Sequence, residues 1–161
     1  MDIRKANVSD YESVWRIFIQ VIKAGDTYVF PPDTDKRDLS KYWFTPDMET
    51  YVVEDQGEII GTYFIKPNQP GLGSHIANCG YMVSPDAQGK GIGKLLCKHS
   101  IKRSKELGFK AMQFNLVVST NQAAIKLWEK YGFKIIGTIP NGFNHLTLGY
   151  VDFHIMYRSL N

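Results

Sequence analysis

The stretch Gln88-Gly89-Lys90-Gly91-Ile92-Gly93 lies between a predicted strand, residues 75–83, and a predicted helix that begins near Gly91. Glycines let backbone N–H groups converge on an anion, and the positive end of the following helix dipole adds attraction, so this order predicts a phosphate cradle. Lys90 and Lys94 would add positive charge. The alternative is a connector that only makes a tight turn. Neither the P-loop nor the dinucleotide-binding pattern fits the glycine spacing.

The elements around this turn alternate between helical and strand periodicity. The pattern β, α, α, β, β, β, α, β, α, β, β predicts one α+β, or mixed α/β, domain over residues 1–161. A polar turn is expected at 141–145, between the last two strands, and Ser9-Asp10 is expected to cap the first helix, which Gly25 ends. The expected strands are residues 1–6, 50–54, 59–66, 75–83, 111–118, 134–139 and 149–158, and the later helices are 35–43, 91–108 and 121–131.

Composition excludes several classes of protein. The chain has 161 residues, 43% of them hydrophobic, and a net charge of +3 that is spread along the sequence rather than clustered. Nucleic-acid recognition usually needs a basic stripe, so we expect no nucleic-acid partner. No window is apolar enough for a membrane span, and Cys79 and Cys97 have neither metal-ligand nor redox spacing. We therefore expect a cytoplasmic protein with reduced thiols and no bound metal.

Two longer motifs resemble one known family. The run VSPDAQGKGIGKL, residues 83–95, resembles motif A of the GNAT acetyltransferase superfamily, Gln/Arg-x-x-Gly-x-Gly/Ala. The run STNQAAIKLWEKYGFKIIG, residues 119–137, resembles its motif B. The resemblance covers nearly the whole chain. It implies the GNAT fold, a mixed and mostly antiparallel sheet of about seven strands, splayed at strands 4 and 5 and flanked by about four helices.

The resemblance also implies acetyl-CoA as co-substrate and assigns residues to it. In the family, backbone amides of the motif A turn bind the pyrophosphate, and the pantetheine arm pairs like an extra strand with the preceding strand. Asn121 matches the asparagine that bonds this arm, and a helix N-cap is its alternative, compatible role. The positions carried over are Tyr81, Met82 and Val83 on the strand, then Gln88, Gly89, Lys90, Gly91, Ile92, Gly93 and Lys94 in the turn, and Asn121.

Trp128 departs from the family pattern. Many members have a tyrosine there, which protonates the departing thiolate, and an indole N–H is a poor acid. Tyr131 is a candidate substitute, with packing as its alternative role. The thiolate of coenzyme A can also leave unprotonated.

A closer resemblance, in residues 61–83 and 114–121, is to azetidine-2-carboxylate acetyltransferases, which acetylate cyclic imino acids related to proline. By this likeness Asn78 binds the acceptor's carboxylate. Asn115 and Leu116 lie beside the thioester, where a donor polarises its carbonyl oxygen. The alternative for both asparagines is a core amide bonded to a bulged strand, because an unpaired amide inside an apolar strand is costly.

The acceptor pocket is expected to be closed by the loop after the first helix and by the last turn. Thr27, Tyr28 and Phe30 supply the loop side, and the turn side is Asn141, Phe143 and Asn144. The strand 75–83 contains no carboxylate that could act as a base. His75 is a candidate, but a solvated histidine and a water relay through backbone carbonyls are favoured.

These observations predict an acetyl-CoA-dependent N-acetyltransferase in which the amine of a small molecule, such as an amino or imino acid, attacks the thioester directly. Two alternatives stay open within the enzyme class: acetylation of a protein N-terminus, or of an antibiotic or herbicide. A noncatalytic acyl-CoA-binding regulatory module is the alternative outside it. A homodimer is expected from the family.

Overall fold

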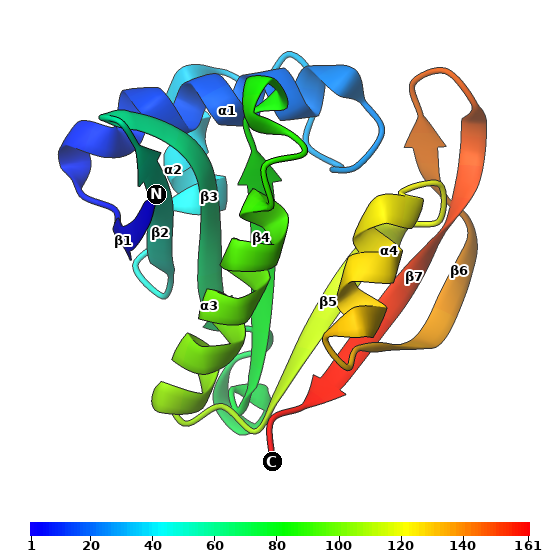
Figure 1. Cartoon of the computed structure of the whole chain (residues 1–161). Coiled ribbons are helices and arrows are strands. Elements are labelled where there is room, and N and C mark those ends of the chain that lie inside the picture. Colours follow the sequence, from blue (N-terminus) through cyan, green and yellow to red (C-terminus); the bar gives the residue numbers. More distant parts are fainter.

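The computed structural model describes residues 1–161 as one seven-stranded sheet with helices on both faces (Figure 1). The sheet order is β1-β2-β3-β4-β5-β7-β6, and every neighbouring pair is antiparallel except β4 and β5. The strands are β1 Asp2–Lys5, β2 Glu49–Asp55, β3 Glu58–Pro67, β4 Ile76–Val83, β5 Ala111–Val118, β6 Lys134–His145 and β7 Gly149–Ser159; the helices are α1 Tyr11–Ala24, α2 Leu39–Trp43, α3 Ile92–Glu106 and α4 Gln122–Lys130. The predicted fold is confirmed.

Two apolar cores lie on opposite faces of the sheet. One contains residues of α3 and α4, such as Leu96 and Ile125, and the other contains residues of α1 and α2, such as Phe18 and Trp43. Helix α1 buries Val14, Ile17, Phe18 and Ile22, which recur at helical spacing and so form one apolar stripe. Burial of this stripe holds α1 against one face of the sheet. The loop that follows α1 therefore lies on the same face.

The cap of the first helix differs from the prediction. The capping residue is Asn7 and not Ser9. The Asn7 side chain accepts the N–H of Ser9 at 2.9 Å, and the Asp10 carboxylate accepts the N–H of Asn7 at 2.8 Å. This reciprocal pair is a capping box on a short 3₁₀ turn, Val8–Asp10, that precedes α1. Asp10 also binds Arg4 at 2.8 Å, so the cap is anchored to β1.

The predicted polar turn at 141–145 is wrong. Strand β6 continues through it to His145, and Phe143, Asn144 and His145 pair with β7. The pairing shifts register between Ile135 and Gly137 and again between Ile139 and Phe143, where the Asn141 N–H donates to the Asp152 carboxylate at 2.9 Å. The polar residues there form a bulge inside a strand. The same residue types also form turns, which explains the wrong prediction.

No helix has the length and apolar character needed to cross a membrane.

Candidate active site

The sheet opens between β4 and β5. Their parallel pairing consists of two residue pairs, Ile76 with Ala111 and Ala77 with Met112, after which the strands diverge toward their carboxyl ends (Figure 1). A cleft of about 1170 Å³ lies there, lined by β4, β5, the first turns of α3 and α4 and the loop after α1. Divergence at the carboxyl ends of parallel strands is the usual place for a ligand in an open sheet.

The glycine-rich turn leaves a row of backbone N–H groups without a protein acceptor. None of the six backbone N–H groups from Gly89 to Lys94 donates to an acceptor within the protein; the first helical bond runs from the Leu95 N–H to the Gly91 carbonyl, at 3.1 Å. Gly89 and Gly91 have φ of 81° and 77°, which favour glycine and turn successive N–H groups to one side.

Charge in the turn also suits a diphosphate. Lys90 and Lys94 are exposed beside the cradle, and the first turn of α3 contains no acidic residue. The side chain of Ile92 is buried in the core, so this residue can contribute only its backbone. Gln88 and Gly93 line the cleft. The residues present therefore fit the pyrophosphate of coenzyme A.

The edge of β4 presents backbone groups to the cleft. The Tyr28 hydroxyl donates to the Tyr81 carbonyl at 2.6 Å and accepts the Tyr81 N–H at 2.8 Å. Because alternate residues of a strand direct their backbone groups to the same side, Val83 shares this orientation and the backbone of Met82 faces β3, where it pairs with Thr62. Of the three predicted strand positions, two thus turn their backbone toward the cleft.

Asn121 caps α4 and lines the cleft. Its Oδ1 accepts the Ala124 N–H at 3.3 Å, and its Nδ2 donates to no protein group. The N-cap role is thus present, and the amide N–H₂ stays available to a ligand.

Asn78 lies where β4 and β5 separate. Its Nδ2 donates to the Gln113 carbonyl at 3.0 Å, one residue beyond the last parallel pair, and its Oδ1 has no protein partner. The predicted core role for this asparagine is therefore real. Its free oxygen and second N–H leave room for a ligand contact.

Asn115 and Leu116 form a bulge on β5. They fall between the pairs Phe114–Met156 and Val117–His154, and no β7 residue is in register with them. The Asn115 side chain is exposed and bonds Asn68 at 2.7 Å and Gln113 at 3.0 Å. Both residues line the cleft, and the interruption of the ladder makes their backbone a candidate source of donors.

The loop after α1 covers one side of the cleft. Thr27, Tyr28 and Phe30 line it, and the rings of Tyr28 and Phe30 stack with centroids 5.8 Å apart. Phe143 and Asn144 line a second cavity of about 180 Å³, which shares Tyr28 and Phe30 with the cleft. Asn141 lines neither, so the structure does not support its predicted place in the pocket.

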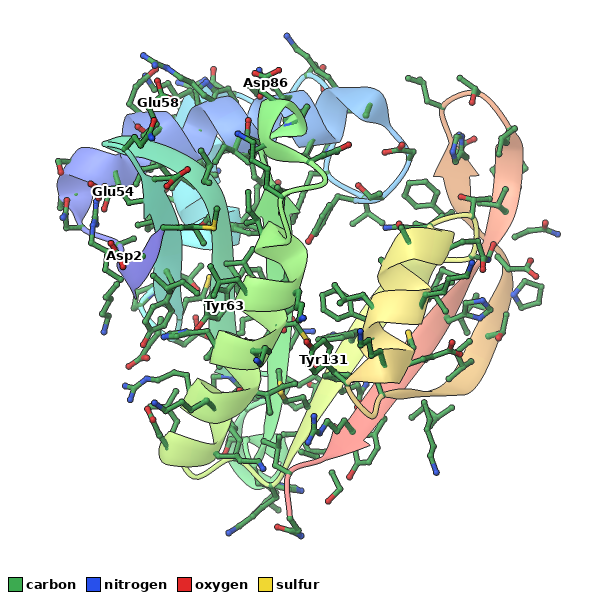
Figure 2. The ribbon with its side chains drawn as sticks, in the orientation of Figure 1. Asp2, Glu54, Glu58, Tyr63, Asp86 and Tyr131 are labelled. Atoms are coloured by element: carbon green, nitrogen blue, oxygen red, sulfur yellow. The ribbon has the colours of Figure 1, made fainter.

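Trp128 faces the cleft as an aromatic wall. Its ring lies 4.8 Å from that of Tyr81 and 4.9 Å from that of Phe114, and its Nε1 donates no hydrogen bond within the protein. Tyr131, at the C-terminal end of α4 (Figure 2), packs on the core and does not line the cleft. His75 is exposed before β4 and also lies outside it.

The sequence analysis missed three charged residues of the cleft, which are Asp26, Lys41 and Lys66. Asp26 is the one carboxylate that lines the cleft, and Lys66 lines it from β3. Asp26 precedes the predicted Thr27 directly, so the loop prediction could have included it. The place of Lys66 depends on the pairing of β3 with β4, which no local pattern gives. No group of three His, Cys, Asp or Glu side chains is arranged to hold a metal.

Comparison with known proteins places this fold and cleft in a family. The model of the acetyltransferase (GNAT) family matches residues 12–133. The solved structure of a GCN5-related N-acetyltransferase from Kribbella flavida superposes with a TM-score of 0.93 and is 38% identical, over 98% of this chain and 96% of that one. The chain belongs to the acetyltransferase (GNAT) family, whose members use acetyl-CoA as acetyl donor, as the two motifs predict.

Two curated relatives are informative. N-acetyltransferase aca1 of Schizosaccharomyces pombe is 40% identical over 111 residues, which are 68% of this chain and 53% of the relative. L-amino acid N-acetyltransferase AaaT of Escherichia coli is 28% identical over 162 residues, covering 97% of this chain and 96% of the relative. The chain thus spans about half the length of aca1 and nearly all of AaaT.

Proposed function

We propose that residues 1–161 act as one acetyl-CoA-dependent N-acetyltransferase domain, and that the acceptor is the amine of a small amino or imino acid. The observation that carries the proposal is one continuous cleft that joins the amide cradle of Gly89–Lys94 to the loop-covered space around Tyr28 and Phe30. The amino-acid acceptor is favoured by similarity to AaaT and by the sequence likeness to azetidine-2-carboxylate acetyltransferases.

Donor binding follows from the geometry of the backbone. Acetyl-CoA would supply the activated acetyl group. The N–H groups of Gly89–Lys94 bind the pyrophosphate, the backbone of Tyr81 and Val83 pairs with the amides of the pantetheine arm, and the Nδ2 of Asn121 bonds the same arm.

Acceptor chemistry takes place where the strands diverge. The neutral amine attacks the thioester carbonyl carbon, and backbone N–H groups at the Asn115–Leu116 bulge stabilise the negative charge that develops on oxygen. The carbon–sulfur bond breaks with its electron pair moving to sulfur, and the nitrogen loses its proton to water. The Trp128 wall offers no acid, so the thiolate leaves unprotonated.

Release of coenzyme A thiol tests this function. The panel contains amino acids, L-azetidine-2-carboxylate, a polyamine, an aminoglycoside, phosphinothricin and peptides with a free N-terminus. We expect turnover with amino or imino acids. Turnover with peptides alone, or with the aminoglycoside alone, would contradict the proposed acceptor. Turnover with phosphinothricin alone, itself an amino acid, would favour the herbicide alternative, and coenzyme A binding with no turnover would indicate a regulatory module.

The homodimer and the cytoplasmic location stay predictions. Light scattering after size-exclusion chromatography measures the first.

A further inference from the structure

Lys66 is a half-buried residue that lines the cleft, and its ammonium group has no counter-ion. Of the three charged residues that line the cleft, Lys41 pairs with Asp38 at 2.9 Å, whereas no carboxylate lies within 4.0 Å of the Lys66 ammonium. Its Nζ lies over the Phe64 ring, 5.7 Å from the centroid. This contact places the ammonium on the ring face at the wall of the cleft, where it can attract an anion.

Lys66 and Asn78 share one face of the sheet. They are directly opposite each other in the antiparallel β3–β4 pair, so their side chains project to the same side, where α1 and its loop lie. Asn78 already donates one N–H to Gln113 and keeps the second. An ammonium and an amide N–H side by side are the donors that a carboxylate accepts.

We infer that Lys66 is the cationic half of a carboxylate subsite and makes the enzyme select acceptors that carry a carboxylate next to the amine. The inference rests on the proposed function and names the side chain that recognises the carboxylate of its acceptor. The subsite lies beside the end of the cleft where β4 and β5 are still paired. An acceptor held there by its carboxylate directs its amine toward the part where the strands have diverged, beside the Asn115–Leu116 bulge.

The test compares the best amino or imino acid of the panel with its own primary amide, in which a neutral group replaces the carboxylate. Wild type should prefer the acid in kcat/KM by about tenfold or more, since one charge-assisted hydrogen bond is exchanged for a neutral one. Lys66→Met keeps the apolar stem and should raise KM for the acid about ten- to a hundredfold while leaving KM for the amide and for acetyl-CoA unchanged. Lys66→Arg should restore most of the preference.

The control is Lys41→Met, which removes the other cleft lysine and should change neither KM. Equal kcat/KM for acid and amide in wild type, or an equal loss for both in Lys66→Met, would overturn the inference, and the wild-type ratio decides even if the methionine variant does not fold. If no amine is acetylated, the proposed function fails by itself. Calorimetry of the acid and the amide with the coenzyme A complex then decides on the subsite.

A separate observation concerns Tyr28. Its hydroxyl forms hydrogen bonds with both backbone groups that Tyr81 directs toward the cleft. It donates to the carbonyl and accepts from the N–H. Burial raises the pKa of this phenol, so it stays protonated and keeps both bonds. The ring is fixed by stacking on Phe30 and by an edge contact with Trp43, whose centroid is 6.1 Å away.

We infer that Tyr28 is a latch that closes the β4 edge in the free enzyme and opens when acetyl-CoA binds. A donor that pairs with Tyr81 must displace the hydroxyl, because an N–H and a carbonyl in this position cannot bond both partners fully. Displacement moves Tyr28, which also lines the acceptor side and the second cavity. Binding of the donor thereby reshapes the acceptor pocket, and this inference also rests on the proposed function.

Tyr28→Phe keeps the ring and removes only the hydroxyl. Coenzyme A should bind this variant at least about fivefold more tightly by calorimetry, because two hydrogen bonds no longer compete with the ligand. The Tyr81 amide hydrogen should exchange faster in the free variant than in free wild type, and equally slowly in the two complexes. Tyr42→Phe is the control: Tyr42 also lines the cleft, and its hydroxyl bonds no protein group.

Unchanged or weaker coenzyme A binding by Tyr28→Phe would overturn the latch. A loss of kcat above about a hundredfold at unchanged affinity would overturn it as well, since the phenol would then act in the chemical step, to which general acids contribute factors of that size.

Discussion

Gly91 is the N-cap residue of α3 and has a conformation that an alanine adopts only under strain. Its φ is 77°, and a Cβ added there would meet no protein atom within 4 Å, so Gly91→Ala changes backbone energy without a steric clash. A left-handed conformation costs a residue other than glycine about 1–2 kcal/mol. The turn can avoid this cost by rotating φ to negative values, which turns the neighbouring N–H groups away from the cradle.

The size of the effect on binding follows from that strain. To bind the pyrophosphate, the Gly91→Ala variant must return to the glycine conformation, so coenzyme A affinity should fall about five- to thirtyfold, the equivalent of about 1–2 kcal/mol. Pantetheine, which lacks the pyrophosphate, should bind the variant and wild type equally. Calorimetry of both ligands measures the difference.

Gly108 offers a matched control on the same helix. It follows the C-terminal end of α3 with φ of 85° and equally open space, but lies far from the cradle. Gly108→Ala should lower Tm by about 2–8 °C, from the same strain and about 2–4 °C per kcal/mol, without changing coenzyme A affinity. Unchanged coenzyme A binding by Gly91→Ala, or an equal loss for pantetheine, would refute the assignment of these amides to the pyrophosphate.

Two further predictions concern the aromatic wall and the anchor of α3. Trp128→Phe should leave kcat for thiol release within about fivefold of wild type, because the indole supplies no acid. The variant should lower the free energy of unfolding in urea by about 1–2 kcal/mol, because it buries less apolar area. A much larger drop in kcat would show that the indole acts in the reaction. Glu49 binds Arg103 at 2.9 Å, which lowers the pKa of Glu49 from 4.5 to about 2 in the folded protein. Because the folded-state pKa is depressed, the pair stabilises the protein above the unfolded pKa and loses this effect as pH falls toward 2. Glu49→Gln should therefore be less stable than wild type near pH 7 and approach it in acid, whereas Glu58→Gln, at an exposed residue with no ion pair (Figure 2), should show a constant difference.

Features set by neighbouring residues could be predicted from the sequence. The start of α3 depends on the glycines that precede it, and the strands that flank the cleft depend on short apolar runs, so the predicted bounds of these elements lie near the observed ones. The error at 141–145 has a local cause as well. Asn141 and Gly142 are typical of a turn, but Asp152 on the neighbouring strand bonds the Asn141 N–H and keeps the chain in the sheet.

Contacts between distant segments could not be predicted in this way. Tyr28 and Tyr81 are 53 positions apart, and nothing in either segment indicates that a hydroxyl will bond that backbone. Lys66 meets Asn78 through the register of β3 and β4, which a shift of one residue would reverse to the other face. The resemblance to a family predicted which β4 residues contact the cofactor. It gave no information on which side chains of other segments approach this strand.

Opening a parallel pair exposes backbone groups that a closed sheet would satisfy, and buried N–H and carbonyl groups without partners are costly. This chain meets that demand in three ways. Asn78 bonds the Gln113 carbonyl with its side chain just beyond the last strand pair, and Tyr28 bonds Tyr81. The turn at Gly89–Lys94, which lines the cleft, leaves its N–H groups without a protein acceptor. The first bond keeps the strands joined at the narrow end and is structural. The other two sets of backbone groups are the ones that the proposed donor, a strand-like arm with a pyrophosphate, would take over.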